Sequence, residues 1–258
     1  MIILIAESKT MAPCEAAVSP DAFAGHCPVF SSRADSIMGS LGDASPAELA
    51  KDVKISGSLA LRLQAMIREF PNKLAGSKAI EAFTGVVFKA FGYSSLSEAE
   101  KAETGLKVRI ISSLYGWLHA DDFVKPYRFD FTTPLAPDGQ RFAAYWREDV
   151  TGELLAELAS SGSGDVLSLL PADAEKCIDW KRLEGKAKVW RADFRSVGSG
   201  ARLTTPHAGK LKTLRGQLLR CVIMDRINSP EQLMSLSGED FMSAGEVGAA
   251  GNILFHTV

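Results

Sequence analysis

The sequence lacks the short motifs that mark the common nucleotide-binding and hydrolytic enzymes. It has no GxxxxGK[ST] phosphate loop, no GxGxxG after a strand, no GxSxG nucleophile elbow and no HExxH zinc motif. No catalytic class follows from motifs alone, and any site must be sought in less regular stretches.

The sequence also lacks a large excess of positive or negative charge. The 29 Lys and Arg residues nearly balance 31 Asp and Glu residues, for a net charge of −2. This balance argues against a strongly basic nucleic-acid-binding protein, although a local basic patch remains compatible with it.

Metal-ligand patterns are missing as well. The four cysteines, Cys14, Cys27, Cys177 and Cys221, form no CxxC, and the four histidines are scattered along the chain. We therefore predict no metal and no cofactor. We expect free thiols, with a Cys14–Cys27 bond as the alternative.

Long hydrophobic runs are absent from the start of the chain. The opening run, Ile2–Ala6, is too short for a signal-peptide core or a membrane span. We expect a cytoplasmic protein that does not enter a membrane. A hydrophobic content of 46% and a charged content of 23% are typical of a globular protein.

Strand and helix patterns alternate along the 258 residues. Apolar runs predict strands at Ile2–Ala6, Ala79–Phe83, Val108 onward, Asp165–Leu170 and Asn252–Thr257, and a hairpin of Lys188–Arg195 with Ala201–Thr205 across Gly198–Gly200. Caps and helical spacing predict helices from Pro46, from Ser97 to Gly105, and at Leu61–Phe70, Gln140–Ser160 and Pro206–Ile227. We predict one α/β domain over residues 1–258, with a mixed central sheet flanked by helices.

The stretch Val108–Phe131 has a composition unlike that of a core segment. A buried strand is followed at once by a tyrosine–glycine turn, paired acids, and a second tyrosine next to an arginine. Such a mixture at the end of a strand is typical of a functional loop. The bland alternative is an edge strand with packed aromatic rings and solvated charges.

This stretch resembles the YaaA family of bacterial peroxide-stress proteins. The matching residues are Ser112, Leu114-Tyr115-Gly116, Leu118, Asp122, Pro126-Tyr127-Arg128 and Asp130, with Lys9-Thr10 near the start and Lys212 and Arg215-Gly216 near the end. The resemblance covers nearly the whole chain. The sequence departs from the family pattern at Ser58, Val86, Phe88, Ser168, Thr213 and Thr257, and has Ala6-Glu7-Ser8 where Ser-Pro-Ala is usual.

The resemblance implies a DNA-binding protein of the response to hydrogen peroxide. Double-stranded DNA would lie in a basic cleft, and the phosphates would contact Lys9, Arg128, Lys212 and Arg215, with Lys210 nearby. The first half of the expected helix Pro206–Ile227 is basic. The resemblance also suggests a helix-hairpin-helix-like element near the link Pro71–Ser77, which is shorter than in the family's common form.

The alternative is an enzyme acting on a nucleotide-like or phosphorylated small molecule. Tyr115 and Tyr127 would stack on or hydrogen-bond a ring, and Arg128 would hold an anion. Asp122, Asp130 or Tyr115 would be the catalytic group. Because no catalytic motif is recognised, the non-enzymatic function is favoured, and the sequence leaves the enzyme open.

Overall fold

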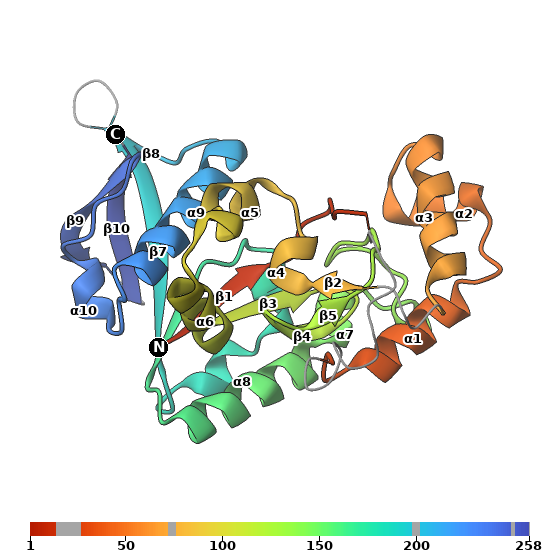
Figure 1. The fold of residues 1–258 in the computed structure, drawn as a ribbon, viewed down its shortest axis with the longest axis horizontal. Helices are drawn as coiled ribbons and strands as arrows, with labels where there is room; N and C mark the ends of the chain where they lie inside the picture. Colours follow the sequence, from red (N-terminus) through yellow and green to blue (C-terminus); the bar gives the residue numbers. More distant parts are fainter. Residues whose placement is uncertain (14–26, 72–75, 198–201, 249–250, 258) are drawn as a thin grey trace.

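The structure is a computed structural model that describes residues 1–13, 27–71, 76–197, 202–248 and 251–257. A central mixed sheet is flanked by helices (Figure 1), which confirms the predicted α/β class. In the described part of the chain, no helix combines the length and apolar character needed to cross a membrane. Cys27 carries a free thiol, whereas Cys14 lies outside the described residues.

The sheet has a parallel centre and antiparallel edges. Its strand order is β4-β3-β1-β6-β7-β10-β9, and β8 pairs with β7. The parallel strands are β1 (Ile2–Ala6), β3 (Val108–Ser112), β6 (Asp165–Ser168), β7 (Lys188–Val197) and β10 (Asn252–Thr257). The antiparallel strands are β4 (Gly116–His119), β8 (Leu203–Thr204) and β9 (Phe241–Val247). All residues of β1 and β3 are buried, as expected for strands covered on both faces.

The strand order reverses at β1. From β1 the chain reaches β3 on one side and later returns to β6 on the other side. Open α/β sheets bind ligands outside the carboxyl ends of their strands at such a reversal. The segments that follow Ala6 and Ser168 therefore mark the first place to look for a site.

The helices follow the caps and periodicities of the sequence. They are α1 (Ser31–Ser40), α2 (Pro46–Val53), α3 (Gly57–Glu69), α4 (Ala79–Ala82), α5 (Val86–Phe91), α6 (Glu98–Lys107), α7 (Phe142–Tyr145), α8 (Arg147–Ser161), α9 (Ala208–Met224) and α10 (Pro230–Leu233). Ser45 and Ser97 form complete capping boxes. In Figure 1, α2 and α3 stand together, apart from the sheet.

Helix α9 packs directly on α5, and a glycine permits this approach. A Cβ atom at Gly216 would lie 2.3 Å from the carbonyl oxygen of Val87. The close contact fixes the side chains on the first half of α9 relative to the start of α5. It therefore positions Lys212 opposite Val86 and Val87.

Several predicted elements differ from the structure. Ala79–Phe83 is not a strand: Ala79–Ala82 form α4, after β2 (Ser77–Lys78), which pairs with β5 (Phe123–Val124). A short apolar run does not distinguish a strand from a buried helical turn. The predicted helix Gln140–Ser160 is divided at Trp146, and α6 continues beyond Gly105.

The predicted hairpin is confirmed at its paired strands. β7 pairs antiparallel with β8, while the connection at Gly198–Gly200 lies outside the described residues. The edge strand β9 was not predicted.

Candidate functional site

A pocket of about 340 Å³ opens where the strand order reverses, at the carboxyl ends of β1 and β6. We call it the switch pocket. It is lined by Ala6–Thr10, Gly85–Phe88, Asp130, Phe131, Pro171, Asp173 and Lys212. Apolar walls with a few charged groups, in a cavity of this size, are typical of small-molecule sites.

Lys9 and Asp130 form an ion pair in this pocket. The distance from Lys9 Nζ to Asp130 Oδ2 is 2.7 Å, and Asp130 Oδ1 accepts hydrogen bonds from the backbone and hydroxyl of Thr132. Partial burial disfavours the ionised acid, but the hydrogen bonds from Lys9 and Thr132 prevail and lower the pKa of Asp130 to about 2. So acidic a group is a weak base at neutral pH, and it acts here as the partner of Lys9.

Arg128 supports the loop that carries Lys9. Its Nη1 donates to the backbone oxygen of Lys9 at 2.7 Å. The side chain is half-buried and does not belong to the pocket lining. Arg128 therefore holds the loop after β1 in place, and the direct anion contact stays a prediction.

Glu7 is a site residue that the sequence reasoning did not select. Its carboxyl Oε2 accepts hydrogen bonds from the backbone N–H of Ser113, at 2.8 Å, and from the hydroxyl of Tyr127. Its Oε1 is buried and, among the described residues, has no hydrogen-bond partner. Burial raises the pKa of Glu7 to about 7, against the lowering effects of the Ser113 side chain, the Tyr127 hydroxyl, the Ser113 backbone N–H and the Ser112 side chain, so both protonation states exist at neutral pH.

The two tyrosines of the predicted site are enclosed by the protein itself. The Tyr127 hydroxyl bonds Glu7 and lies 2.7 Å from Ser112 Oγ, while the Tyr115 hydroxyl accepts from the backbone N–H of Lys125. Their rings pack edge to face, with centroids 5.8 Å apart, and both are buried. Neither ring has a face open to a stacking ligand, and Tyr127 contributes through its hydroxyl instead.

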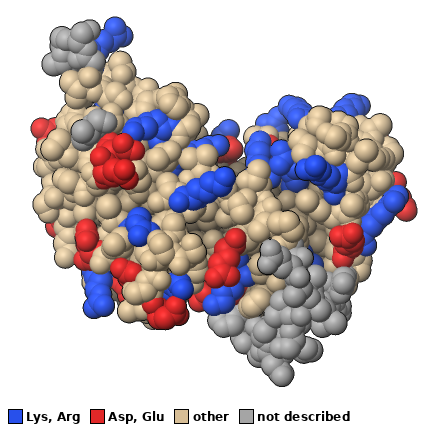
Figure 2. Space-filling model, turned by 45° about the horizontal axis from the view of Figure 1, so that its top comes forward, with Lys and Arg blue, Asp and Glu red and all other residues tan. Residues whose placement is uncertain are grey.

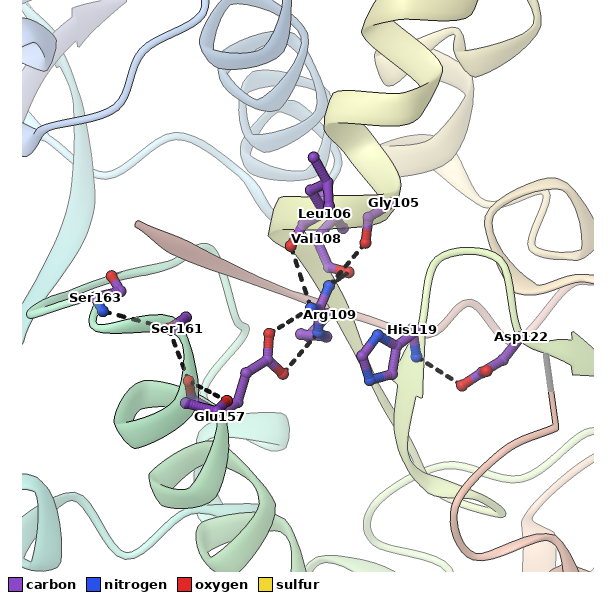
Figure 3. A network of polar contacts seen from close by, with 10 residues as sticks. Gly105, Leu106, Val108, Arg109, His119, Asp122, Glu157, Ser161 and Ser163 are labelled. Atoms are coloured by element: carbon purple, nitrogen blue, oxygen red, sulfur yellow. Dashed lines mark hydrogen bonds and ion pairs between the residues drawn. The ribbon is translucent and has the colours of Figure 1, made fainter. Parts of the chain in front are cut away.

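Asp122 lies away from the switch pocket, in the turn after β4 (Figure 3). Its Oδ2 accepts a hydrogen bond from the backbone N–H of His119 at 2.7 Å, and the side chain is buried. It is not among the residues that line the pocket. The structure therefore gives Asp122 a role in holding this turn, and the acid–base role stays a prediction.

The basic residues of α9 separate into three environments. Lys212 is exposed and lines the switch pocket. Arg215, one turn further on, lines a neighbouring pocket of about 300 Å³ together with Arg191 and Arg195. Lys210 instead pairs with Asp240, at 3.0 Å. Of the predicted residues, the fold thus gathers Lys9, Asp130 and Lys212, with Arg215 next to them.

Within the described ranges, no group of three or more His, Cys, Asp or Glu side chains is arranged to hold a metal ion.

Comparison with known proteins decides the family. The model of the family described as peroxide stress protein YaaA matches residues 1–246. The chain belongs to this family. It is 28% identical over 258 residues to a UPF0246 protein of Parabacteroides distasonis, covering 99% of both chains. A UPF0246 protein of Shewanella baltica is 27% identical over 259 residues, covering 99% of this chain and 98% of its own.

Two of this YaaA-family member's departures from the family pattern lie in the switch pocket. Val86 and Phe88 line it, at positions where the resemblance led us to expect an acid and a tyrosine. Phe88 packs on Phe83, with centroids 5.3 Å apart, and Val86 is 43% exposed. The α5 side of the pocket is therefore apolar, and Glu7 adds an acid to the lining. The signal for Glu7 was an acid directly after the first buried strand.

Proposed function

We propose that this YaaA-family protein binds double-stranded DNA through a basic cleft and acts in the response to peroxide stress. The family description supports the stress role. The carrying observation is the surface in Figure 2: the molecule is hollowed between two masses, and Lys and Arg side chains gather along both sides of the hollow. Phosphate charge is the main source of sequence-independent affinity for such a surface.

The first half of α9 supplies the side chains best suited to phosphate. Lys212 is exposed, and in the described part of the chain no acid pairs with it. Arg215 is half-buried in a pocket whose two other arginines pair with Glu175 and Asp193. Among the described residues Arg215 has no such partner, so its planar guanidinium suits a two-pronged contact with a phosphate. Lys9 and Lys210 already have carboxylate partners, so we assign them weaker contacts.

Helices α2 and α3 support a second contact with the DNA backbone. They pack on each other across the turn Lys54–Ser56, in which Lys54 adopts a left-handed conformation. Ser56 makes no side-chain cap to α3, so N–H groups at the start of this 13-residue helix remain available to an anion. Lys51, Lys54 and Arg62 are exposed on the pair. The link Pro71–Ser77, near which a helix-hairpin-helix-like element was expected, lies partly outside the described residues, so α2 and α3 enter the proposal only as a further contact with the DNA backbone.

Fluorescence anisotropy with labelled duplex DNA, titrated from low to physiological salt, tests the proposal. Wild-type affinity should fall steeply with salt, because bound phosphates release counterions. The double variant Lys212→Glu/Arg215→Glu should bind more than about tenfold more weakly.

Lys181→Glu/Lys186→Glu makes the same change in net charge and is the matched control. Both lysines are exposed and precede β7, at the amino edge of the sheet. If both double variants lose the same DNA affinity, the loss comes from the change in net charge and not from the assigned surface. Unchanged affinity of Lys212→Glu/Arg215→Glu would refute the assigned surface.

The alternative function, an enzyme acting on a nucleotide-like or phosphorylated small molecule, is favoured by one observation. Glu7 carries a buried, half-satisfied carboxyl in the switch pocket, which DNA-backbone binding does not require.

A further inference from the structure

The switch pocket contains more acid than a phosphate-binding groove for DNA would. Glu7, Asp130 and Asp173 line it together with Lys9 and Lys212. A carboxylate facing a polyanion weakens binding, so these acids point to a ligand with one anionic group and another part that interacts with an acid.

We propose that the switch pocket binds a small phosphorylated molecule and that Glu7 exchanges a proton with it. Lys212 and Lys9 hold the phosphate, and the remainder of the molecule packs on the apolar wall formed by Val86 and Phe131. This inference deepens the alternative function given above, and it does not depend on DNA binding.

The charges of the pocket suit one phosphate group. Lys212 is exposed and unpaired among the described residues, which leaves its three N–H donors for a ligand. The Lys9 side chain is 62% exposed although it pairs with Asp130, so its ammonium group can contact both Asp130 and a phosphate. Val86 exposes apolar surface at the same opening, which a ligand would cover.

The hydrogen bonds around Glu7 select the atom that carries the proton. Oε2 is fixed by two donors, the Ser113 N–H and the Tyr127 hydroxyl, whereas Oε1 has none. Trp146 Nε1 donates to the Ser113 carbonyl at 2.7 Å and so fixes the residue that holds Oε2. Oε1 is buried and lacks such a donor among the described residues, so we assign to it the proton that passes to and from a ligand hydroxyl or carbon.

Charge balance links this proton transfer to the lysines. When a proton moves from the ligand to Oε1, Glu7 becomes neutral and the ligand gains one negative charge. Lys212 and Lys9 then face a more negative ligand, while the repulsion from Glu7 disappears. Proton transfer by a carboxyl group whose pKa lies near the working pH is efficient in both directions.

Titration calorimetry and NMR with adenosine monophosphate, ribose 5-phosphate and glucose 6-phosphate test the proposal. At least one probe should bind in the micromolar to millimolar range, and Lys212→Met should weaken it about tenfold or more. Lys89→Met, an exposed lysine of α5 outside the pocket lining, is the matched control and should bind like wild type. The absence of binding by all three probes would overturn the proposal.

The variant Glu7→Gln tests the proton carrier alone, because it removes the ionisable group and leaves the rest of the pocket unchanged. Between about pH 6 and about pH 8, wild-type affinity should fall several-fold more than that of Glu7→Gln, because only the wild type gains a negative charge there. The ionisation of the probe is common to both proteins and cancels. Identical pH profiles would refute the role of Glu7. Because Glu7→Gln should leave salt-sensitive DNA binding intact, a failure here is distinguishable from a failure of the DNA-binding proposal.

Discussion

Two buried charged groups lie near opposite ends of strand β3, and they differ in how completely they are hydrogen-bonded. Arg109, the second residue of the strand, meets Glu157 of α8 (Figure 3). Glu7 is held by Ser113, directly after the last residue of the strand. Both sites remove charge from water, which costs free energy unless partners replace the lost hydration.

The Arg109 site is complete. Nε donates to Glu157 Oε2 at 2.8 Å, Nη2 pairs with Glu157 Oε1, and backbone carbonyls of Gly105, Leu106 and Val108 accept the remaining hydrogen bonds. Every nitrogen of the guanidinium has a partner. Such a site ties the end of α6, strand β3 and α8 together, and it leaves little capacity for a ligand.

The Glu7 site is incomplete. One carboxyl oxygen has two donors and the other has none among the described residues. The comparison suggests that full satisfaction of a buried charge serves the fold, whereas an unsatisfied atom beside a pocket serves a function.

Removing Arg109 should have the largest effect. Arg109→Met keeps much of the aliphatic volume but leaves Glu157 and three carbonyls without their donor, so the free energy of unfolding should fall by about 3–5 kcal/mol. Urea denaturation at neutral pH measures it. The control is Arg182→Met, which breaks an exposed pair with Glu148 at 2.6 Å and should cost less than about 1 kcal/mol. An equal loss of unfolding free energy in Arg109→Met and in the control would contradict the structural role of the Arg109 site.

Replacing Glu7 should change how stability depends on pH. Burial raises the pKa of Glu7 from an ordinary 4.5 to about 7, so between these values the folded protein holds more protons than the unfolded chain. Folded-state stability therefore falls as the pH rises through this interval, and the loss is complete above about pH 7.

Glu7→Gln has no such ionisation. Relative to wild type, its free energy of unfolding should improve by on the order of 2 kcal/mol between about pH 5 and about pH 8. Thermal and urea unfolding across this range measure the difference. Glu81→Gln, at an exposed carboxylate, is the control and should show a nearly constant difference. If the difference in unfolding free energy between Glu7→Gln and wild type does not change with pH, the pKa of Glu7 in the folded wild type is ordinary.

Secondary structure could be predicted from the sequence where a single local pattern determines it. The buried run Ile2–Ala6 predicted β1, and Trp146, Val150, Leu154 and Leu158 predicted the buried face of α8, although Trp146 itself is the break before that helix. Ala79–Phe83 failed because its length and composition suit a strand and a helical turn equally. There, pairing of the neighbouring Ser77 and Lys78 with β5 decides the structure, and that contact is distant in sequence.

The residues of the candidate site could be predicted from the sequence only in part. Lys9 follows a buried parallel strand, so its position near the carboxyl edge of the sheet could be anticipated. The unusual state of Glu7 could not, because it depends on burial and on Ser113 and Tyr127, more than 100 residues away. Asp122 shows the opposite case: an acid in a promising motif bonds the backbone three residues away, and no sequence pattern indicates that contact.

Removing a single donor from the incomplete site should have the smallest effect on stability and a clear effect on acidity. Tyr127→Phe deletes the hydroxyl that donates to Glu7 Oε2. With one fewer hydrogen bond to the ionised form, the pKa of Glu7 should rise by about one unit, while stability falls by only about 1 kcal/mol. The carboxyl carbon resonance of Glu7, assigned by its loss in Glu7→Gln, reports the titration midpoint.

Tyr115→Phe is the matched control for this measurement. It deletes a buried hydroxyl that bonds Lys125 rather than Glu7, from a ring that packs against Tyr127. The Glu7 midpoint should therefore stay within about 0.3 units of wild type in this variant. A midpoint that falls in Tyr127→Phe would mean that the Tyr127 hydroxyl accepts a hydrogen bond from the protonated acid. In that case the proton resides on Oε2, and Oε1 is not the atom that exchanges it.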